Sequence, residues 1–517
     1  AGEGNATWEG VSGQFGGTLH NDPEDGWRSA RFTGNSDVGE GDFYNYQPEN
    51  YLVTPSDRFS LFAQGDFAIT DDVKLYAEGL YAFRQSDRLL APEPLFIIVP
   101  GISVSRDNVY NPFDRDFIDV RRRFVENRNR RFTATAHTYR LVTGVEGELP
   151  DFGTFRDWSW DVNFNFGRTE SADVNRGVLS QSRVQNAVGP SFLDEDLTAR
   201  CGTPDNPIDG CVPLNLFGGA GTITQDMLDY VSWTGTNRGF SEQLILTAGA
   251  GGEIFELWDR AVQMAIGVQH RTERGGQQPN AIEVLGDSTG NNAQPTEGEY
   301  QEIAGYIELN IPLLADLPLI ELFEVNASAR IFDFDTFGTD FMYEFGAIWQ
   351  IYSDVSLRGN YSRAFRAPSV GELFAGSADS FPNAVDPCDE GINGQIDPNS
   401  ELGRRCQTAT ENPAPIGDQD VTFETGQSQI RTILGGNPNL DPETADVITA
   451  GVVWEPTFAE FLRGLSFTFD YYNISIQDSV STIGADIILA NCFTAEEQSN
   501  CDQIQRNAVG LITQIDD

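Results

Sequence analysis

The amino-acid sequence predicts an all-β fold, an antiparallel transmembrane β-barrel with short turns at one end and long loops at the other. Apolar and polar residues alternate along many segments, the connections between these segments are alternately short and long, and tryptophans gather near the short ones. No run of about 18 apolar residues occurs, so no membrane-spanning helix is expected. A closed barrel is the other structure that satisfies its backbone hydrogen bonds in lipid.

The composition of the 517 residues agrees with many strands joined by polar loops. Glycine (52) and phenylalanine (35) are frequent, whereas methionine and histidine occur only 3 times each. The net charge is −45, from 78 acidic and 33 basic residues. Such a chain repels nucleic acid, so a nucleic-acid partner is not expected.

The clearest predicted hairpin covers residues 58–84. Phe59 and Leu61 lie on one face of its first strand, whereas Ser60 lies on the other. A turn at 71–72 leads into the second strand, which alternates in the same way. Both strands exceed the roughly 9–11 residues that a tilted strand needs to cross a membrane.

The same alternation predicts twelve strands in all. They cover residues 58–70, 73–85, 132–148, 158–170, 243–252, 261–274, 299–311, 321–334, 339–352, 355–366, 443–455 and 464–477. An apolar face opposite a polar face fits lipid on one side of a barrel wall and water or protein on the other. It also fits a soluble β-sandwich, so alternation alone does not decide between the two folds.

The connections between these strands favour the barrel. Every second connection is short: 71–72, 149–157, 253–260, 312–320, 353–354 and 456–463. The intervening ones are long, at 86–131, 171–242, 275–298 and 367–442, with 335–338 as the exception. Outer-membrane barrels have short periplasmic turns and long extracellular loops, whereas a soluble sandwich has no reason to sort its loops in this way.

Tryptophan positions agree with this arrangement. Five of the eight tryptophans lie at or near the short connections: Trp158, Trp160, Trp258, Trp349 and Trp454. An aromatic girdle at a membrane surface has this distribution. Tryptophans of an ordinary core would not favour one end of the strands.

The six cysteines form three close pairs, all on the long-loop side: Cys201 with Cys211, Cys388 with Cys406, and Cys492 with Cys501. Close pairs in polar loops indicate local disulfides formed in an oxidising compartment. Local pairing is the simplest of the possible connectivities, and sequence leaves the others open. Because C-x-x-C motifs are absent and histidines are scarce, neither a metal site nor a cofactor is expected.

Two longer motifs carry a family resemblance. Residues 357–374 read LRGNYSRAFRAPSVGELF and residues 436–445 read GNPNLDPETA, followed at 465–476 by LSFTFDYYNISI. In this order they resemble the barrel of TonB-dependent receptors, and the resemblance covers about residues 50–510. It implies a barrel of about 22 strands filled by an N-terminal plug. It also implies an N-terminal box that the inner-membrane protein TonB pulls.

The resemblance predicts how the chain is organised. Residues 1–57 are expected to be loop with one or two strands of the barrel's N-terminal part, and residues 58–517 to be its central part. Neither a plug nor the family's C-terminal strands are recognised. About 12–14 of about 22 strands are therefore expected, in a fragment cut at both ends.

Five arginines are candidates for ligand contact: Arg121, Arg122, Arg123, Arg363 and Arg366. The first three lie in the one basic block, where they would meet an anionic ligand or lipopolysaccharide phosphates. The alternative, which is favoured, is that the block neutralises acidic residues between 114 and 126. The other two belong to the first motif and face either the barrel wall or its lumen, with an architectural role favoured.

The expected function is energised uptake of a scarce nutrient, such as a ferric siderophore, cobalamin or an oligosaccharide, across a Gram-negative outer membrane. The expected partners are that nutrient, membrane lipid and lipopolysaccharide, and TonB acting through a plug segment not seen in this sequence. An enzyme is not expected, because His20, His137 and His270 are far apart and match no catalytic or metal-binding spacing.

Two alternatives stay open. The first is a passive porin-like channel, which is also a barrel but has no plug. The second is a secreted acidic β-sandwich that binds or cleaves glycans. An upstream plug of about 120–150 residues, an ordinary domain size, would separate the receptor from the channel.

Overall fold

Strands dominate the chain. The computed structural model describes residues 5–9, 15–22, 26–29, 47–97, 101–218, 221–389, 396–407, 429–457, 459–462, 464–495, 498–506 and 512–516. Within these ranges, no helix combines the length and the apolar character needed to cross a membrane.

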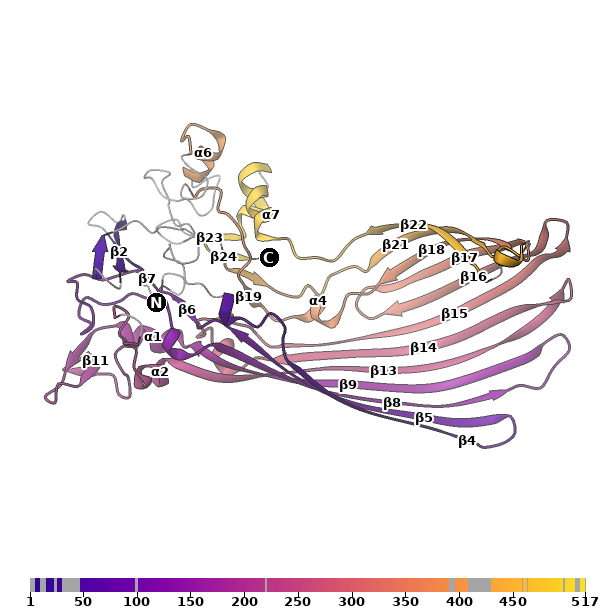
Figure 1. Cartoon of the computed structure of the whole chain (residues 1–517), viewed down its shortest axis with the longest axis horizontal. Coiled ribbons are helices and arrows are strands. Elements are labelled where there is room, and N and C mark those ends of the chain that lie inside the picture. Colours follow the sequence, from indigo (N-terminus) through magenta and orange to yellow (C-terminus); the bar gives the residue numbers. More distant parts are fainter. Residues whose placement is uncertain are drawn as a thin grey trace.

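Twelve long strands form one antiparallel sheet, in which each strand pairs with the next long strand along the chain (Figure 1). They are β4 (Ser56–Ala68), β5 (Val73–Leu90), β8 (Arg130–Glu148), β9 (Arg156–Leu179), β13 (Ser232–Leu257), β14 (Arg260–Gln278), β15 (Thr296–Leu317), β16 (Ile320–Phe334), β17 (Gly338–Tyr352), β18 (Val355–Arg366), β21 (Glu443–Trp454) and β22 (Phe467–Gln477). All twelve predicted strands are present. Within the described ranges, β4 and β22 form the two edges of the sheet.

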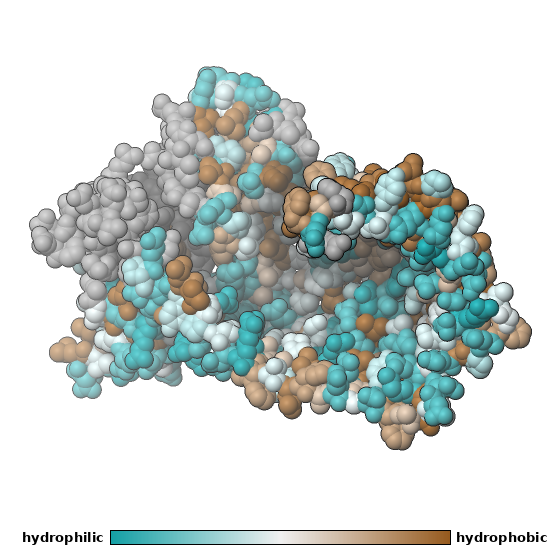
Figure 2. Space-filling view, turned by 45° about the vertical axis from the view of Figure 1, so that its right-hand side comes forward, coloured by the Kyte–Doolittle hydropathy of each residue, from teal (hydrophilic) through white to brown (hydrophobic). Residues whose placement is uncertain are grey.

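The sheet has one apolar face and one polar face. Large side chains such as Ile303 and Ile331 stand exposed on the apolar face, at 64% and 60%. Phe345 shares this face and is 57% exposed, whereas a sandwich would bury it against a second sheet. The sandwich alternative is therefore wrong. Figure 2 looks into the hollow of the curved sheet, where hydrophilic residues predominate. Lipid against the apolar face accounts for both surfaces.

The connections are sorted as predicted. Figure 1 shows the short turns at one end of the sheet and the long loops at the other. Indole N–H groups bind backbone carbonyls near the short turns: Trp258 Nε1 donates to Leu313 O (2.8 Å), and Trp349 Nε1 donates to Leu319 O (2.9 Å). These tryptophans have the mixed apolar and polar environment of an interfacial girdle.

Several strands continue beyond their predicted ends, mainly at the long-loop end. β9 continues to Leu179, and β13 begins at Ser232 instead of residue 243. The extensions carry polar cross-strand partners such as Asp173 and Asn237. Beyond the apolar belt neither face contacts lipid, so the alternation that the prediction depends on fades while backbone pairing continues.

The long loops form a layer with small elements of its own (Figure 1). Its short strands are β6 (Pro94–Phe96), β7 (Asp119–Arg123), β10 (Ser191–Leu193), β11 (Ala199–Thr203), β12 (Asn206–Pro207), β19 (Ala378–Ser380), β20 (Thr432–Leu434), β23 (Ile504–Arg506) and β24 (Ile512–Asp516). Its helices are α1 (Gln181–Val188), α2 (Gln225–Val231), α3 (Ala281–Val284), α4 (Val370–Phe374), α6 (Glu401–Gln407), α7 (Ala485–Ala490) and α8 (Gln498–Cys501). Shorter helical turns are η1 (Gln47–Glu49), η2 (Val125–Asn127) and η4 (Asn491–Ala495), while η3 (Glu460–Leu462) lies in the short β21–β22 connection.

The N-terminal segment contributes strands to a small five-stranded sheet in the loop layer. Its strands β1 (Asn5–Glu9), β2 (Phe15–Asp22) and β3 (Gly26–Ser29) pair with β7 and β6 in the loop layer, in the order β3-β2-β1-β7-β6. All three are shorter than the roughly 9–11 residues that a membrane-crossing strand needs. Residues 30–46 of this segment lie outside the described ranges.

Buried clusters and disulfides hold the loop layer together. Leu214, Leu216 and Phe117 belong to one cluster, and Ile488 and Ile515 to another. The three predicted disulfides are confirmed: Cys201–Cys211 lies in the first cluster, and Cys388–Cys406 and Cys492–Cys501 lie in the second. Cross-links of this kind restrict the unfolded chain, which lets small cores hold long polar loops in one conformation.

Candidate functional site

The polar face of the sheet carries a hydrogen-bonded set of side chains near the short turns. Lys74 Nζ lies 2.7 Å from Glu146 Oε1, and Tyr76 donates to Asp161 Oδ2 at 3.3 Å. Lys74, Glu146 and Asp161, together with Tyr306, border a polar groove of about 640 Å³. A wall of this kind presents donors and acceptors to water, to a hydrophilic solute or to a protein segment inside the barrel.

The opposite face has a groove of similar size but apolar character. It has a volume of about 670 Å³, and its lining includes Ala248, Ile266, Ile307 and Ala329. A shallow apolar groove on a lipid-facing wall fits acyl chains. Its apolar lining suits an apolar group better than a hydrophilic solute.

Closer to the long loops, the polar face holds a buried carboxylate between two guanidinium groups. Glu302 is 2% exposed, and its two oxygens lie 3.1 Å from Arg271 Nε and 2.5 Å from Arg330 Nη2. The two arginine side chains are partly exposed, at 26% and 24%. A buried carboxylate needs such partners, and the two cations offer further N–H donors to an anionic or carbonyl-rich ligand.

Helix α4 lies on the polar face beside this group. Leu373 of α4 is 1% exposed and packs in one cluster with Tyr300, Ala304 and Phe332. Gly275 and Gly298, which face each other across strands β14 and β15, make room for the helix. A Cβ atom on Gly298 would lie 2.1 Å from the Phe374 ring. The absence of side chains at these positions thus lets a helix sit directly on a β-ladder.

A clamp of three charged residues fixes the start of α4. Arg366 reaches Glu372 with two hydrogen bonds of 2.9 and 3.0 Å, and Glu443 with two of 2.8 and 3.0 Å. Ser369 and Glu372 also form a capping box at the N-terminus of the helix. The hydrogen bonds from Arg366 lower the pKa of Glu372 to about 2, so this carboxylate is ionised at neutral pH.

The second sequence motif docks onto the same helix. Gly436 N donates to Ala375 O at 2.9 Å, and Asn437 N donates to Glu372 O at 2.8 Å. A Cβ atom on Gly436 would lie 2.4 Å from the Ala375 nitrogen, so only glycine fits this approach. The two motifs are separated by most of a long loop in the sequence. They therefore pack together as one structural unit around α4.

The five arginines predicted for ligand contact belong to two separate segments, β7 and β18. Arg122 is buried and binds Glu126 (2.8 Å) and the carbonyls of Leu216 and Gly218. Arg123 donates to Pro92 O at 2.9 Å. The third residue of this basic block, Arg121, belongs to β7, and its side chain lies outside the described part of the structure.

The two motif arginines point to different faces. Arg363 is a cross-strand partner of Tyr343 and Asp446, on the face that carries Phe345. Arg366 binds Glu372 and Glu443 on the polar face. Sequence reasoning did not find the Arg271–Glu302–Arg330 group, because its members lie on three strands. The available signal was a charged residue on the polar face of each strand.

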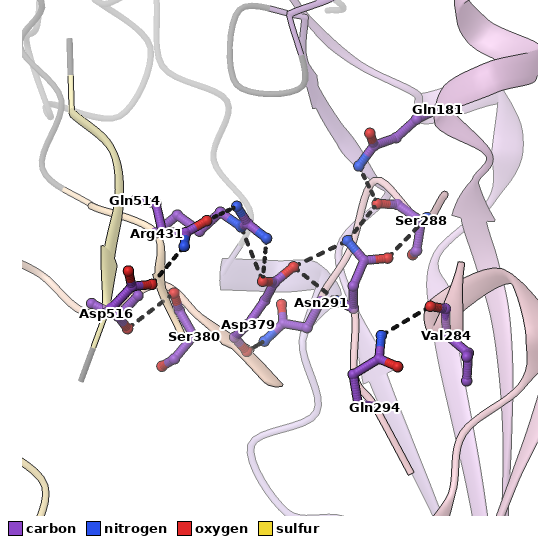
Figure 3. Close-up of polar contacts among 12 residues, drawn as sticks. Gln181, Val284, Ser288, Asn291, Gln294, Asp379, Ser380, Arg431, Gln514 and Asp516 are labelled. Atoms are coloured by element: carbon purple, nitrogen blue, oxygen red, sulfur yellow. Dashed lines mark hydrogen bonds and ion pairs between the residues drawn. The ribbon is translucent and has the colours of Figure 1, made fainter. Parts of the chain in front are cut away.

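A polar network joins the loops above the sheet (Figure 3). Asp379, 8% exposed, accepts two contacts from Arg431 (2.9 and 2.8 Å) and one from the Asn292 backbone (3.0 Å). Arg431 also donates to Gln514 Oε1 at 2.8 Å, which links the last described segment to the rest. The loop layer is therefore tied together by side chains from three separate connections, which favours a single arrangement over independent loops.

The sequence model of the family described as "TonB dependent receptor-like, beta-barrel" matches residues 100–510, well over half of the chain. The chain belongs to the TonB-dependent receptor family. This membership confirms the predicted family and the prediction that the protein is a receptor and not an enzyme. Family members are proteins of the outer membrane of Gram-negative bacteria.

Solved structures of other receptors are similar to this one. The siderophore receptor PirA from Acinetobacter baumannii has 10% identity and a TM-score of 0.39, over 100% of this chain and 57% of its own. The RagAB peptide transporter has 13% sequence identity and a TM-score of 0.41, over 81% of this chain and 40% of its own. The ferric enterobactin receptor PfeA from Pseudomonas aeruginosa has 12% sequence identity and a TM-score of 0.34, over 82% of this chain and 54% of its own. The chain thus spans roughly half of their length. None of the curated proteins compared with the chain matches it.

Proposed function

We propose that this receptor takes up a scarce nutrient across the outer membrane in an energised process. The observation that carries the proposal is the family match over residues 100–510 on a sheet with a polar face, an apolar face and loops at one end. Ferric siderophores, cobalamin and oligosaccharides are the substrate classes to be tested. The energy would come from TonB acting through a plug domain, as the family resemblance implies.

The architecture supports a division of labour within the receptor. The twelve strands form a rigid wall, because each is paired along most of its length. The loop layer, tied by disulfides and by the Asp379 network, holds a recognition surface above it. Rigid scaffolds with specific loops are a common way to build a binding site.

We place the nutrient path along the polar face, past Arg271 and Arg330. Their guanidinium groups are partly exposed, and each retains N–H donors beyond those used by Glu302. Ligand contact by Arg121, Arg122, Arg123, Arg363 and Arg366 stays a prediction. For Arg122 and Arg366, the internal partners described above favour a framework role.

Uptake measurements in a Gram-negative host test the proposal. Cells that express the receptor are given a labelled ferric siderophore, cobalamin or maltooligosaccharide, with and without a protonophore and in strains with and without TonB. We expect saturable uptake of one class that stops when either the proton-motive force or TonB is removed. Uptake that survives both treatments would favour the passive channel and contradict the receptor proposal.

A variant pair localises the path. Arg271→Gln/Arg330→Gln removes the two guanidinium groups that bind Glu302, whereas Arg358→Gln removes another cation of the polar face, paired with Asp470 at 2.7 Å. We expect the first variant to raise the KM for uptake and the second to leave it unchanged. Equal uptake by all three proteins would contradict a path beside Glu302.

A further inference from the structure

Helix α4 covers the buried carboxylate of the polar face. Tyr300, Glu302 and Ala304 are two positions apart along β15 and therefore point to the same side of the sheet. Leu373 of α4 packs in one cluster with Tyr300 and Ala304, the neighbours of Glu302 on that side. The helix thus lies over Glu302, and this cover, together with the two arginines, accounts for its 2% exposure.

Weak contacts hold this cover on the wall. Among the five residues Val370–Phe374, Leu373 is the buried one. The charged clamp at the start of the helix is open to solvent, with side-chain exposures of 44% for Arg366 and 31% for Glu372. Exposed ion pairs contribute little, and a short helix with one buried side chain belongs to the least stable part of a fold. Undocking of α4 therefore costs far less than unfolding of the sheet.

The helix can move as one unit. Its capping box joins Ser369 and Glu372, so the backbone N–H groups of its first turn keep partners when the helix leaves the wall. Residues 367–368 precede the box, and residues 375–377, with Gly376 among them, follow the helix. Short segments at the ends of elements act as hinges, because they absorb changes in backbone angles. α4 therefore has internal bonds that survive undocking and a short connecting segment at each end.

Two strands of the loop layer are attached to α4. Residues 375–377 join the C-terminus of the helix to β19, and Gly436, two residues beyond β20, donates to Ala375 O at 2.9 Å. β19 and β20 pair with each other. β19 also carries Asp379, which binds Arg431 and the Asn292 backbone in the network that ties the loops. A displacement of the β19–β20 pair is therefore transmitted to the helix over a few residues.

From these observations we propose that α4 is a gate, which leaves the wall together with the β19–β20 pair and uncovers the Arg271–Glu302–Arg330 group. In the closed position it covers the carboxylate and the buried rings of Tyr300 and Phe332. In the open position the carboxylate, the guanidinium groups and the rings offer acceptors, donors and stacking surfaces to a passing nutrient. The proposal rests on the nutrient path of the proposed function, but the opening itself requires neither nutrient nor TonB.

Thiol labelling of the folded receptor in detergent tests the gate. Ala304→Cys places a thiol beneath α4, at a position that is 3% exposed. Ala315→Cys is the matched control, because Ala315 lies on the same strand, is 1% exposed and is about 35 Å farther along β15. All six native cysteines form disulfides, so each variant has one free thiol. The reagent is a bulky, charged maleimide in excess, added without denaturant.

We expect Ala304→Cys to react about tenfold faster than Ala315→Cys or more, because undocking of α4 exposes the first thiol, whereas the second requires unfolding of the wall. Adding Arg366→Gln to Ala304→Cys should raise the labelling rate about fivefold, the upper end of what exposed ion pairs contribute. Adding Asp379→Asn, which removes the ion pair of β19 with Arg431, should raise the rate in the same direction. Neither change should alter the labelling of Ala315→Cys.

Equal, slow labelling at both positions would show that α4 leaves the wall only when the receptor unfolds, and would overturn the gate. A rate for Ala304→Cys that Arg366→Gln leaves unchanged would overturn it as well. An unchanged rate with Asp379→Asn would contradict the attachment of the gate to the loop layer. No labelling rate depends on uptake, so a failed uptake experiment would leave the gate intact, and a failed labelling experiment would leave the uptake proposal intact.

Discussion

At Arg366, one guanidinium group joins the segment that follows its own strand to Glu443, which lies 77 positions farther along the sequence. Its hydrogen bonds reach Glu372, which follows the strand, and Glu443, which begins the next strand of the sheet. The planar group matches two carboxylates at once, which lysine could not do. The motif that carries the family resemblance is therefore explained at this position by architecture.

Replacing Arg366 should loosen the connection between β18 and β21. Arg366→Gln removes four hydrogen bonds to two carboxylates, and we expect about 1 kcal/mol of local destabilisation after allowance for solvent exposure. Limited proteolysis of this connection should become about fivefold faster. The control is Arg200→Gln, which removes a single exposed pair with Asp194 in another loop. Equal proteolysis of both variants would contradict the clamp.

The lowered pKa of Glu372 makes the clamp sensitive to acid only well below neutral pH. A carboxyl group whose pKa falls from 4.5 to about 2 on folding stabilises the folded state above pH 4.5, and this contribution disappears as the pH falls toward 2. We expect hydrogen-exchange protection of α4, corrected for intrinsic rates, to be constant down to about pH 5 and to decline below it. In Glu372→Gln the profile should lack this decline, and a shared decline would contradict the assignment.

At the scale of elements, the position of α4 depends on its packing against strands β14 and β15. The helix has five residues, too few to be stable by itself, so its position depends on packing against the wall. The facing pair Gly275 and Gly298 provides the space. The same logic applies to the loop layer, where disulfides and small clusters replace a large core.

A methyl group at Gly298 should displace the helix. In Gly298→Ala the new Cβ would lie 2.1 Å from the Phe374 ring, and we expect overpacking of about 1–3 kcal/mol that is relieved by undocking of α4. Hydrogen exchange at residues 370–374 should accelerate. Gly79→Ala is the matched control, because no atom lies within 4 Å of its added Cβ. Unchanged exchange in Gly298→Ala would show that the helix tolerates the methyl group.

For the whole molecule, the two faces of the wall differ in what they contact. Neighbouring residues on β16 show the contrast. Ala329 is exposed in the apolar groove, whereas Ser328 faces the other way, between Glu308 and Glu344. A charge placed on the first meets lipid, while a cation placed on the second meets two carboxylates.

Replacing Ala329 or Ser328 with arginine distinguishes the lipid-facing side of the wall from the side that faces the barrel interior. Ala329→Arg should destabilise the protein by about 2–4 kcal/mol, the cost of a cation on the lipid face near the bilayer midplane. Ser328→Arg should cost much less, because its neighbours are acidic. Urea unfolding from lipid vesicles measures both. If both variants lost the same stability, the assignment of the apolar face to lipid would be wrong.

Much of this fold could be predicted from local patterns. Alternation placed all twelve strands of the large sheet, connection lengths placed the loops at one end, and cysteine spacing anticipated Cys201–Cys211 and the other two disulfides. The prediction was weaker where lipid no longer imposes alternation, as in the extension of β13 to Ser232. The position of the short strands at 5–29 was also not predicted, because β1 pairs with the distant strand β7.

The candidate site could be predicted only in part, for the same physical reason. Alternation is a property of neighbouring residues, so a polar face and an apolar face could be inferred without coordinates. Which charges meet depends on strand register and loop closure. These brought Glu302 between Arg271 and Arg330, and paired Arg366 with Glu443. Such contacts join residues of separate strands, and no local pattern in one strand specifies its register against another.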